Sequence, residues 1–434
     1  MPTQSTFGMI PHELLKGQAR DTKRAGPHML NWIKRHMNRV ISRALRNKSA
    51  REDVHERVIE LHPKGASIGR VLVSYVIQPF LLVPGVPLSN AHTHHWESWR
   101  IVQSFLARGF SVDVVSYLNK TFKPQKDYQI FFAARTNLQR IADHLPSSCL
   151  KVAHLDTAHW LFNNTAAYQR LLALQFRRKV ALTNIKMVEV NWALEHADLA
   201  TILGNQFTIN TYVYAGKPIH RIPISAPESY DYPEHRNIDV VRNHYLWFGS
   251  SGFVHKGLDL VLEAFAGMPD KHLHVCGPFD DEPAFMAEFD QELHHTPNIH
   301  AHGWVDVAGD EFSDICSSCV GLVYPTASEG GGGSAISCMH MGLIPILSYE
   351  ASVDTESFGV TLRENSIDEI RRVVSDLSGR SATELAERGR QAWRYARQHH
   401  TRESFGTAFD DCVDKVMIPA LRSRTGIDNQ VVYS

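Results

Sequence analysis

The sequence has no run of apolar residues long enough to cross a membrane as a helix. A helical span needs about 20 consecutive apolar residues, and no stretch of this 434-residue chain approaches that length. The first twenty residues also lack the charged region followed by an apolar region that marks a secretory signal. Both absences favour a cytoplasmic protein.

Cysteine is scarce as well. Six cysteines in a chain of this length are too few for a disulfide scaffold, which agrees with a reducing compartment. Cys316 and Cys319 have the spacing of a redox pair, but they follow a helical pattern and precede a strand, whereas a thioredoxin-type pair opens a helix. The sequence has no second pair that would complete a zinc site. We therefore expect two small buried side chains here and no bound metal.

An excess of charge of one sign is also missing. The chain has 45 Lys and Arg against 46 Asp and Glu, and its formal net charge is −1. This balance produces no global field, so we expect no nucleic-acid partner. Residues 28–48 are the exception because they contain basic residues and no acidic ones. The basic residues are Lys34, Arg35, Arg39, Arg43, Arg46 and Lys48.

Apolar residues recur every three or four positions in the same segment, which predicts a basic amphipathic helix. They are Met29, Ile33, Met37, Val40, Ile41, Ala44 and Leu45. One interpretation places this helix on an anionic membrane surface, so that the protein is peripheral at the inner face of the plasma membrane. The other packs the helix on the protein body with a solvated basic face. We assign residues 1–65 to this helical extension.

Strand and helix patterns alternate from Gly69 onward, which predicts an α/β fold with doubly wound parallel sheets. A polar stretch at residues 227–242 interrupts the alternation, and the pattern then starts again. We expect two Rossmann-like domains at residues 66–235 and 240–380, followed by a helical segment at residues 381–434. The strands are expected at residues 70–77, 111–117, 128–133, 150–155, 199–203 and 219–224, and again at 245–248, 272–276, 298–301, 320–324 and 344–347. Two such domains face a cleft at the carboxyl ends of their strands, where ligands bind.

The segment from Phe248 to Phe265 has the features of a phosphate site. A strand is followed by a loop with Gly249, then by Lys256 and a helix. Small loop residues let the backbone approach a phosphate, the helix N-terminus offers free N–H groups, and the lysine adds positive charge.

A second segment, from Tyr324 to Gly342, places Glu329 and four glycines between a strand and a helix. The carboxylate can accept hydrogen bonds from sugar hydroxyls, and the glycine N–H groups can face an anion. A flexible turn is the alternative, but it fits poorly with a run placed directly between a strand and a helix.

Together these segments resemble the donor domain of GT-B glycosyltransferases of the retaining, family-four type. The match includes Gly249, the Lys256-Gly257 pair and Glu329 with Gly330, and the segment at residues 298–305 resembles the family's base-contacting strand and loop. The resemblance implies that Lys256 and Glu329 are catalytic and that the nucleotide-sugar lies against the second domain. The implied donor-binding residues are Gly249, Ser250, Lys256, Gly303, Trp304, Val305, Glu329, Gly330, Gly331, Gly332, Gly333 and Ser337.

Two residues depart from the family pattern. Ser250 replaces an arginine that helps to hold the diphosphate in the family, and Ser337 replaces a second glutamate that usually holds the ribose. Loss of a charge-assisted hydrogen bond to a phosphate costs on the order of 1.5–3 kcal/mol. Lys256, the glycine N–H groups or a further basic residue elsewhere in the chain could offset this loss.

The end of the strand at residues 150–155 offers candidates from the first domain. Relatives in the family have a histidine near the bound sugar, and His159 is the preferred match, with His154 second and Asp156 as a residue that orients it. A neutral imidazole can hydrogen-bond a donor hydroxyl or a leaving phosphate oxygen. The alternative for His159 is a structural role as the cap of the following helix.

A cluster of polar residues after the first strand is expected on the acceptor side. It comprises Asn90, His92, His94 and His95. The histidines also suggest a metal, but Glu97 is the one carboxylate nearby and GT-B enzymes usually need no bound divalent ion. Acceptor contact and a structural role remain the two interpretations.

The resemblance thus implies a retaining glycosyltransferase that moves a sugar from a nucleotide-sugar to a saccharide or lipid-linked saccharide, in surface polysaccharide synthesis and without a cofactor. The alternative is a catalytically silent GT-B subunit that binds a nucleotide-sugar or a partner enzyme, favoured by Ser250 and Ser337. A sugar epimerase would need further acids, and a phosphorylase would need pyridoxal phosphate and a longer chain.

Overall fold

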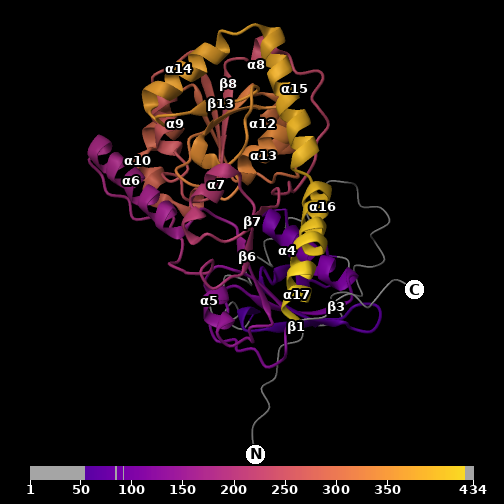
Figure 1. Ribbon diagram of the computed structural model, residues 1–434. Coiled ribbons are helices and arrows are strands. Elements are labelled where there is room, and N and C mark those ends of the chain that lie inside the picture. Colours follow the sequence, from indigo (N-terminus) through magenta and orange to yellow (C-terminus); the bar gives the residue numbers. More distant parts are fainter. Residues whose placement is uncertain (1–53, 84–85, 91, 426–434) are drawn as a thin grey trace, which may run out of the picture. The chain divides into compact units, whose positions relative to one another are not determined.

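The structure is a computed structural model that describes residues 54–83, 86–90 and 92–425 (Figure 1). The predicted basic helix at residues 28–48 lies outside the described residues. From Val58 onward the chain forms one compact unit. This unit contains two sheets, of seven and six strands, each covered by helices (Figure 1).

The first sheet has the strand order β1-β3-β2-β4-β5-β6-β7, and every neighbouring pair except β1–β3 is parallel. The strands are β1 (Val58–Leu61), β2 (Gly69–Tyr75), β3 (Phe110–Ser116), β4 (Ile130–Ala134), β5 (Leu150–Leu155), β6 (Leu199–Ile202) and β7 (Ile219–Arg221). Strand β1 lies inside the segment predicted as a helical extension. Its sequence, Val-Ile-Glu-Leu, pairs antiparallel with the edge of β3.

Alternate residues of the central strands pack into two different cores. Phe132 lies in a core with Phe105 of a helix on one face, whereas Phe131 lies in a second core with Leu138 on the other face. Both phenylalanines are fully buried, which explains the continuous apolar runs in the sequence. The helices and 3-10 turns of this half are η1 (Gln78–Leu81), α4 (Thr93–Ala107), α5 (Thr136–Ala142), α6 (Trp160–Arg178), α7 (Gln206–Asn210) and η2 (Val213–Ala215).

The second sheet is entirely parallel and has the order β10-β9-β8-β11-β12-β13. Its strands are β8 (His244–Phe248), β9 (His272–Cys276), β10 (Ile299–Gly303), β11 (Gly321–Tyr324), β12 (Ile344–Ser348) and β13 (Val360–Leu362). The order reverses between β8 and β11, which makes their carboxyl ends the switch point of the sheet.

Helices cover both faces of the second sheet, as the doubly wound prediction requires (Figure 1). They are α8 (Ile238–Val241), α9 (Leu258–Ala266), α10 (Pro283–Glu288), α11 (Asp290–His295), α12 (Asp310–Ser317), α13 (Gly333–His340) and α14 (Ile367–Ser378), with the 3-10 turns η3 (Phe279–Asp281) and η4 (Tyr349–Ala351).

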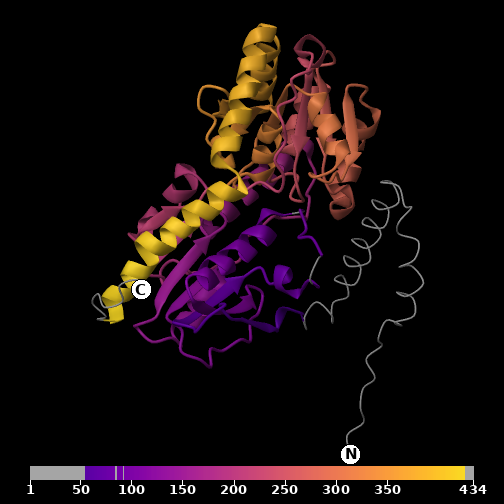
Figure 2. The same cartoon turned by 90° about the vertical axis from the view of Figure 1, so that its right-hand side faces the viewer.

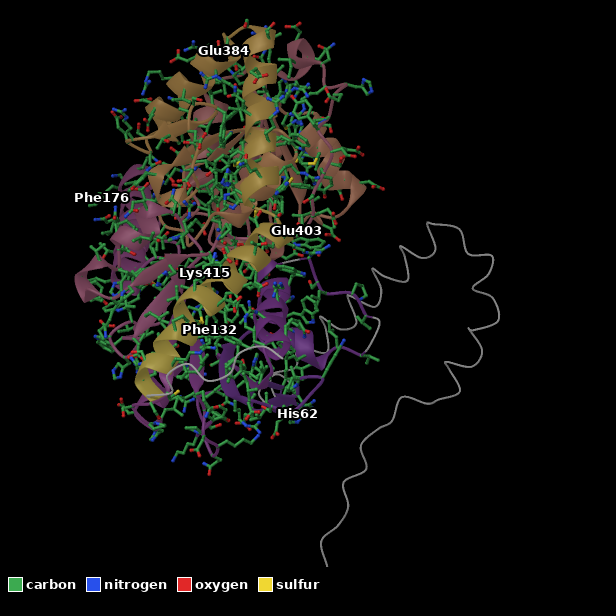
Figure 3. All side chains as sticks on the ribbon, turned by 45° about the vertical axis from the view of Figure 1, so that its right-hand side comes forward. His62, Phe132, Phe176, Glu384, Glu403 and Lys415 are labelled. Carbon is green, nitrogen blue, oxygen red and sulfur yellow. The ribbon has the colours of Figure 1, made fainter. Side chains whose placement is uncertain are left out.

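The C-terminal helices connect the two halves (Figures 1 and 2). Helix α15 (Ala382–His399) packs on α13 of the second half, and α16 (Arg402–Cys412) returns to α4 of the first half. Figure 3 shows Phe132 beneath these helices, and its ring lies 5.6 Å from that of Phe409. A π-helical turn η5 (Val413–Met417) and α17 (Ile418–Thr425) follow. The segment predicted as a separate tail is therefore part of both halves.

All six cysteines are buried free thiols, Cys316 and Cys319 among them. This confirms the expectation of small buried side chains at that pair. No helix among the described residues has the length and apolar character needed to span a membrane.

Candidate functional site

The two glycine-containing segments meet at the switch point of the second sheet. The first follows β8 and the second follows β11, and these strands are neighbours. The loops are joined by hydrogen bonds from His255 Nε2 to Ser328 O (2.9 Å) and from Ala327 N to His255 O (2.8 Å). The loops after β8 and β11, about seventy residues apart in the sequence, therefore form one continuous site.

Lys256 and Glu329 form the centre of this site. Lys256 Nζ lies 2.6 Å from Glu329 Oε1 and 2.7 Å from the Tyr324 hydroxyl, which itself donates to Glu329 Oε1 at 2.7 Å. Thr326 Oγ1 also donates to Glu329 Oε1, at 3.2 Å. All these contacts use one carboxylate oxygen, so Oε2 is left to accept from a ligand.

The electrostatics of the cluster keep Glu329 ionised. Burial alone would raise the pKa of this carboxyl, but the ammonium groups of Lys256 and Lys186 outweigh it and lower the pKa to about 2. Burial and the Glu329 charge raise the pKa of the Tyr324 hydroxyl, which therefore stays protonated and acts as a donor.

Glycines and a buried carboxylate set the shape of the first loop. Gly257 has φ +74°, and a Cβ at this position would lie 2.5 Å from Pro325 O, so no other residue fits without strain. Glu282 accepts hydrogen bonds from the N–H groups of Gly252 and Phe253, the latter at 3.0 Å. Trp247 Nε1 donates to Lys256 O at 3.2 Å. Glu282 and Trp247 thus fix the backbone of the loop that precedes and includes Lys256.

Lys186 is a site residue that the sequence analysis missed. It lies in the irregular segment after α6, and its Nζ donates to Ser251 O at 3.1 Å across the loop that follows β8. The charge of Lys256, followed by burial, lowers the pKa of Lys186 to about 8. No periodic pattern surrounds Lys186 in the sequence, so its approach to this loop follows only from the tertiary fold.

The glycine run brings the two halves into contact. A Cβ on Gly330 would lie 2.2 Å from Asp156 O, and one on Gly331 would lie 3.2 Å from Leu203 O. Gly332 similarly leaves no room beside Ala351 O, at 2.7 Å. Helix α13 begins at Gly333, where the first-turn N–H groups have no intrahelical acceptor. The glycines thus permit close interdomain packing and leave N–H groups available at the helix start.

The two residues that depart from the family pattern have different surroundings. Ser250 follows Gly249 and is partly exposed at the end of β8. Ser337 is buried on α13, and its Oγ donates to Gly333 O at 3.0 Å. Neither serine supplies the charge that the family's residue has at that position.

The end of β10 presents an exposed aromatic ring. Trp304 is 62% exposed, whereas the next residue, Val305, is buried. Gly303 has φ +79° and open space around the position of a Cβ. A flat ring beside an open backbone is suited to stacking with a nucleotide base.

His154 lies near the end of β5 in the first half and has an unsatisfied ring nitrogen. Its Nδ1 lies 2.9 Å from Thr201 Oγ1, and its Nε2 is buried without a protein partner. The Tyr75 hydroxyl and Glu97 Oε2 are buried without partners in the same region, and the Tyr75 ring lies 4.9 Å from that of His154. Burial lowers the pKa of His154 to about 4, so its imidazole is neutral. These three buried polar atoms have no hydrogen-bond partner among the described residues, which is uncommon for buried polar groups.

Asp156 is engaged by an arginine that the sequence analysis did not single out. Arg135 Nε and Nη2 donate to the two carboxylate oxygens at 3.2 and 3.0 Å. Arg135 has φ +59°, an uncommon conformation for a residue with a side chain, at the end of β4. Burial would raise the pKa of Asp156, but Arg135 outweighs this and lowers it.

His159 caps helix α6. Its Nδ1 accepts from Leu161 N at 3.3 Å, and its Nε2 lies 3.1 Å from the Tyr214 hydroxyl. Both ring nitrogens therefore have partners, which is the structural role named above as the alternative. The catalytic assignment of His159 stays a prediction.

The histidines after the first strand lie near the same region. The ring of His94 lies 5.7 Å from that of Tyr75 in a tilted arrangement, and burial lowers the pKa of His94 to about 4. His95 lies 6.5 Å from His92, ring to ring. Asn90 instead accepts from Arg402 at 3.3 Å. Within the described ranges, no three His, Cys, Asp or Glu side chains are arranged to hold a metal ion.

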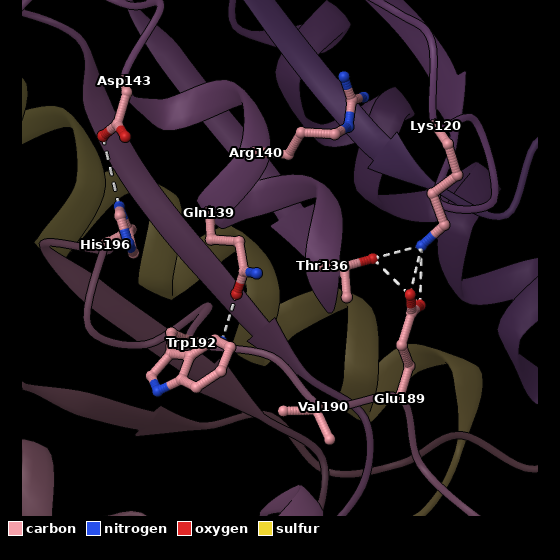
Figure 4. Close-up of a pocket in the computed structure, with 9 residues that line it drawn as sticks. All are labelled: Lys120, Thr136, Gln139, Arg140, Asp143, Glu189, Val190, Trp192 and His196. Atoms are coloured by element: carbon pink, nitrogen blue, oxygen red, sulfur yellow. Dashed lines mark hydrogen bonds and ion pairs between the residues drawn. The ribbon is translucent and has the colours of Figure 1, made fainter.

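A hollow of about 510 Å³ lies on the first half, and none of its lining residues belongs to the loops after β8 and β11 (Figure 4). Its polar side chains pair with one another, as Lys120 does with Glu189 at 2.7 Å and with Thr136 at 2.6 Å. None of the predicted site residues lines it. The candidate site is therefore the cluster around Lys256 and Glu329, not this hollow.

No family model matches the sequence, and no curated protein matches it. Among solved structures, a sucrose-phosphate synthase from Thermosynechococcus elongatus is 12% identical and covers 81% of this chain and 99% of its own, with a TM-score of 0.56. A structure described as trehalose-6-phosphate from E. coli bound with UDP-2-fluoro glucose is 10% identical and covers 84% and 99%, with a TM-score of 0.51. At such identities the likeness concerns the fold, and the chain has the GT-B fold predicted from its sequence.

Proposed function

We propose that the protein is a glycosyltransferase that moves a sugar from a nucleotide-sugar to an acceptor with retention of the anomeric configuration. The observation that supports this most is the Lys256–Glu329 pair at the switch point of a GT-B fold, with unsatisfied first-domain groups at His154 and Tyr75. An ionised carboxylate beside an ammonium group and a helix N-terminus suits a ligand that has both hydroxyls and a diphosphate.

In this proposal Glu329 positions the donor sugar. Its pKa of about 2 keeps it ionised at any physiological pH, and its Oε2 is left to accept from a sugar hydroxyl. Tyr324 and Lys256 fix the carboxylate by bonding Oε1. The carboxylate therefore needs no rearrangement when the sugar arrives.

Lys256 and the start of α13 stabilise the leaving diphosphate. Negative charge develops on the diphosphate as the bond to the sugar breaks, and a fixed ammonium lowers the free energy of that state. The N–H groups from Gly330 to Gly333 add partial positive charge at the helix N-terminus. Trp304 and the Gly303 backbone offer a surface for the base, and the Ser337 hydroxyl lies on the helix that would face the ribose.

The first half contributes the acceptor side. His154 is preferred over His159 as the histidine near the sugar, because its Nε2 is buried and unsatisfied whereas both nitrogens of His159 have partners. The acceptor would enter beside His92, His94 and His95. We propose a saccharide or lipid-linked saccharide of surface polysaccharide synthesis, with residues 28–48 holding the enzyme at the inner face of the membrane.

A catalytically silent subunit is the second candidate. Ser250 and Ser337 favour it, because each lacks the charge of the family residue at its position. The ionised Glu329 and its bond to Lys256 favour an active enzyme instead.

The experiment is a panel of UDP-, GDP-, ADP- and TDP-sugars, tested for binding and for slow hydrolysis. UDP-sugars come first because a structure of this fold binds UDP-2-fluoro glucose. We expect one donor to be hydrolysed, with loss of turnover in Glu329→Gln and Lys256→Met. Lys120→Met, in the separate hollow, is the matched control and should keep wild-type turnover. Tight donor binding without turnover in the presence of acceptors would favour the silent subunit.

A further inference from the structure

Two lysines from different halves of the unit approach the same loop. Lys256 lies at the end of the loop after β8, and its side chain is 5% exposed. Lys186 reaches the other side of this loop from the segment after α6 and donates to Ser251 O at 3.1 Å. Both charges act on Glu329 and on each other. The loop is therefore flanked by an ammonium group from each half.

The position of Lys186 is built by specific contacts. Asn163 Nδ2 donates to Lys186 O at 3.2 Å, and Asn164 exchanges two hydrogen bonds with the backbone of Val188, at 2.9 and 2.8 Å. A Cβ on Gly252 would lie 2.6 Å from Lys186 Cδ, so glycine leaves room for the lysine stem to cross the loop. These contacts fix the lysine from the α6 side and from the loop side.

The acidic groups around Lys186 bond to other partners. Glu329 is ionised and lies near both lysines. Glu282 already accepts from the N–H groups of Gly252 and Phe253, and burial raises its pKa. Arg135 adds further positive charge, although Asp156 pairs with it. Because Lys186 Nζ bonds only a backbone carbonyl among the described residues and Glu329 Oε1 pairs with Lys256, a bound anion would stabilise both ammonium groups.

We propose that Lys186 is the second cation of the diphosphate subsite, supplied by the first half, so that the donor diphosphate is bound between Lys186 and Lys256. This inference rests on the proposed function. Lys186 supplies the positive charge that the family's arginine provides at the position of Ser250. It does so from the first half of the unit, whereas Ser250 belongs to the second. Donor binding then links the two halves directly, because the ligand bridges a residue of each.

The first test compares a nucleoside diphosphate with its monophosphate by calorimetry, using UDP and UMP or the pair that the donor panel selects. We expect Lys186→Met to weaken UDP binding about tenfold to a hundredfold and to change UMP binding by less than about threefold. Lys186→Arg keeps the charge and should bind UDP within a few fold of wild type. Lys179→Met, at the C-terminal cap of α6, is the matched control and should match wild type.

A second variant tests whether Lys186 substitutes for the family's arginine at position 250. Adding Ser250→Arg to Lys186→Met restores a cation on the loop and should recover most of the lost UDP affinity. Failure of both Lys186→Arg and the double variant to bind UDP, with folding intact by circular dichroism, would show that Lys186 matters for structure and not for charge.

Proton uptake gives an independent readout. The charged groups that act on Lys186 are Lys256, Glu329, Glu282 and Arg135, and the titratable side chains of His92 and His255 also interact with it. Lys256, followed by burial, lowers the pKa of Lys186 to about 8. A bound diphosphate raises that pKa, so binding at pH 8 should take up about half a proton in the wild type and much less in Lys186→Arg, whose guanidinium is always charged. The uptake is measured from the binding enthalpy in buffers of different ionisation enthalpy.

The outcomes separate the two proposals. Absence of any nucleoside diphosphate binding to the wild type would overturn the proposed function. Binding to the wild type that is equally strong in Lys186→Met, with equal proton uptake, would leave the proposed function standing and overturn the role of Lys186.

Discussion

At the scale of single residues, the site depends on pairs whose members stabilise each other. Glu329 is half-buried and is held ionised by its contacts with Lys256, Tyr324 and Thr326. Breaking a buried pair by removing one member costs about 3–5 kcal/mol, because the other charge is left uncompensated. The two residues should therefore be coupled in stability as well as in function.

We predict that Lys256→Met destabilises the protein more than the double variant Lys256→Met/Glu329→Gln does. In the double variant no charge remains buried without its partner. Because the folded pKa of Glu329 is about 2 and below its unfolded value, its contribution to stability is present above about pH 4.5 and is lost as the pH falls toward 2. Urea unfolding of the three proteins at pH 7 measures the coupling, and equal destabilisation of both variants would speak against it.

The two histidines of the first half give a second prediction. His154→Ala should lower the turnover of the chosen donor by about 10²-fold, since its neutral imidazole would no longer contact the substrate. His159→Ala should mainly weaken the α6 cap, at a cost of about 1 kcal/mol in unfolding free energy. Steady-state rates and urea unfolding distinguish the roles, and the reverse pattern would restore His159 as the catalytic histidine.

Some residues of the candidate site could be predicted from the sequence and others could not. Lys256 and Glu329 were predicted because each lies at a fixed distance from a strand and a glycine loop, which is local information. Lys186, Arg135 and Tyr75 were missed because they reach the site only through tertiary packing.

At the scale of elements, three adjacent strands on one side of the second sheet share a ladder of five histidines. These are His244 on β8, His272 and His274 on β9, and His300 and His302 on β10. Ring nitrogens of neighbouring strands lie 3.0–3.2 Å apart in three pairs, and the rings of His244 and His272 stack at 4.4 Å. Each pair needs at least one neutral imidazole, because the accepting ring nitrogen must be unprotonated.

The ladder should make stability depend on pH. Burial and the neighbouring histidines lower the pKa of His274 to about 3, and the pKa values of His244, His300 and His302 are lowered as well. The unfolded pKa of about 6.5 is higher, so the contribution to stability is present above pH 6.5 and is lost as the pH falls below it. We predict a lower urea midpoint at pH 5 than at pH 7.5. The double variant His274→Gln/His300→Gln should reduce that difference, and an unchanged difference would refute this origin.

Elements were also the level at which the sequence was most informative. The apolar runs of β2 and β4 and the start of α9 follow from local pattern, and the structure confirms them. The edge strands β1 and β13 were not predicted, because each is only three or four residues long and is stabilised by its neighbour.

At the scale of the whole described unit, the two halves meet through close contacts that sequence pattern does not encode. Arg177 on α6 pairs with Asp259 on α9 at 2.6 Å, and Arg178 pairs with Glu292 on α11 at 2.7 Å. Helices α15 and α16 extend from one half to the other (Figure 2). The sequence predicted two sheets and a cleft, but not which side chains from opposite halves would meet.

The contact at Gly330 yields a prediction at this scale. Gly330→Ala adds a Cβ 2.2 Å from Asp156 O, so the two halves must separate locally. We expect a severalfold rise in the donor KM and increased susceptibility of the domain contact to proteolysis. Gly333→Ala is the matched control, because its Cβ would meet only Ile224 at 3.6 Å. Equal KM values for both variants would mean that this contact does not define the binding conformation.

The most direct test of the central claim is a proton NMR time course of donor hydrolysis by the wild type, run across the nucleotide-sugar panel. One record reports both turnover and the anomeric configuration of the released sugar. The proposed function predicts slow release of sugar with the configuration of the donor, and no release by Glu329→Gln. Absence of both sugar release and sugar transfer to any acceptor, from every donor, would contradict the claim that this chain is a glycosyltransferase.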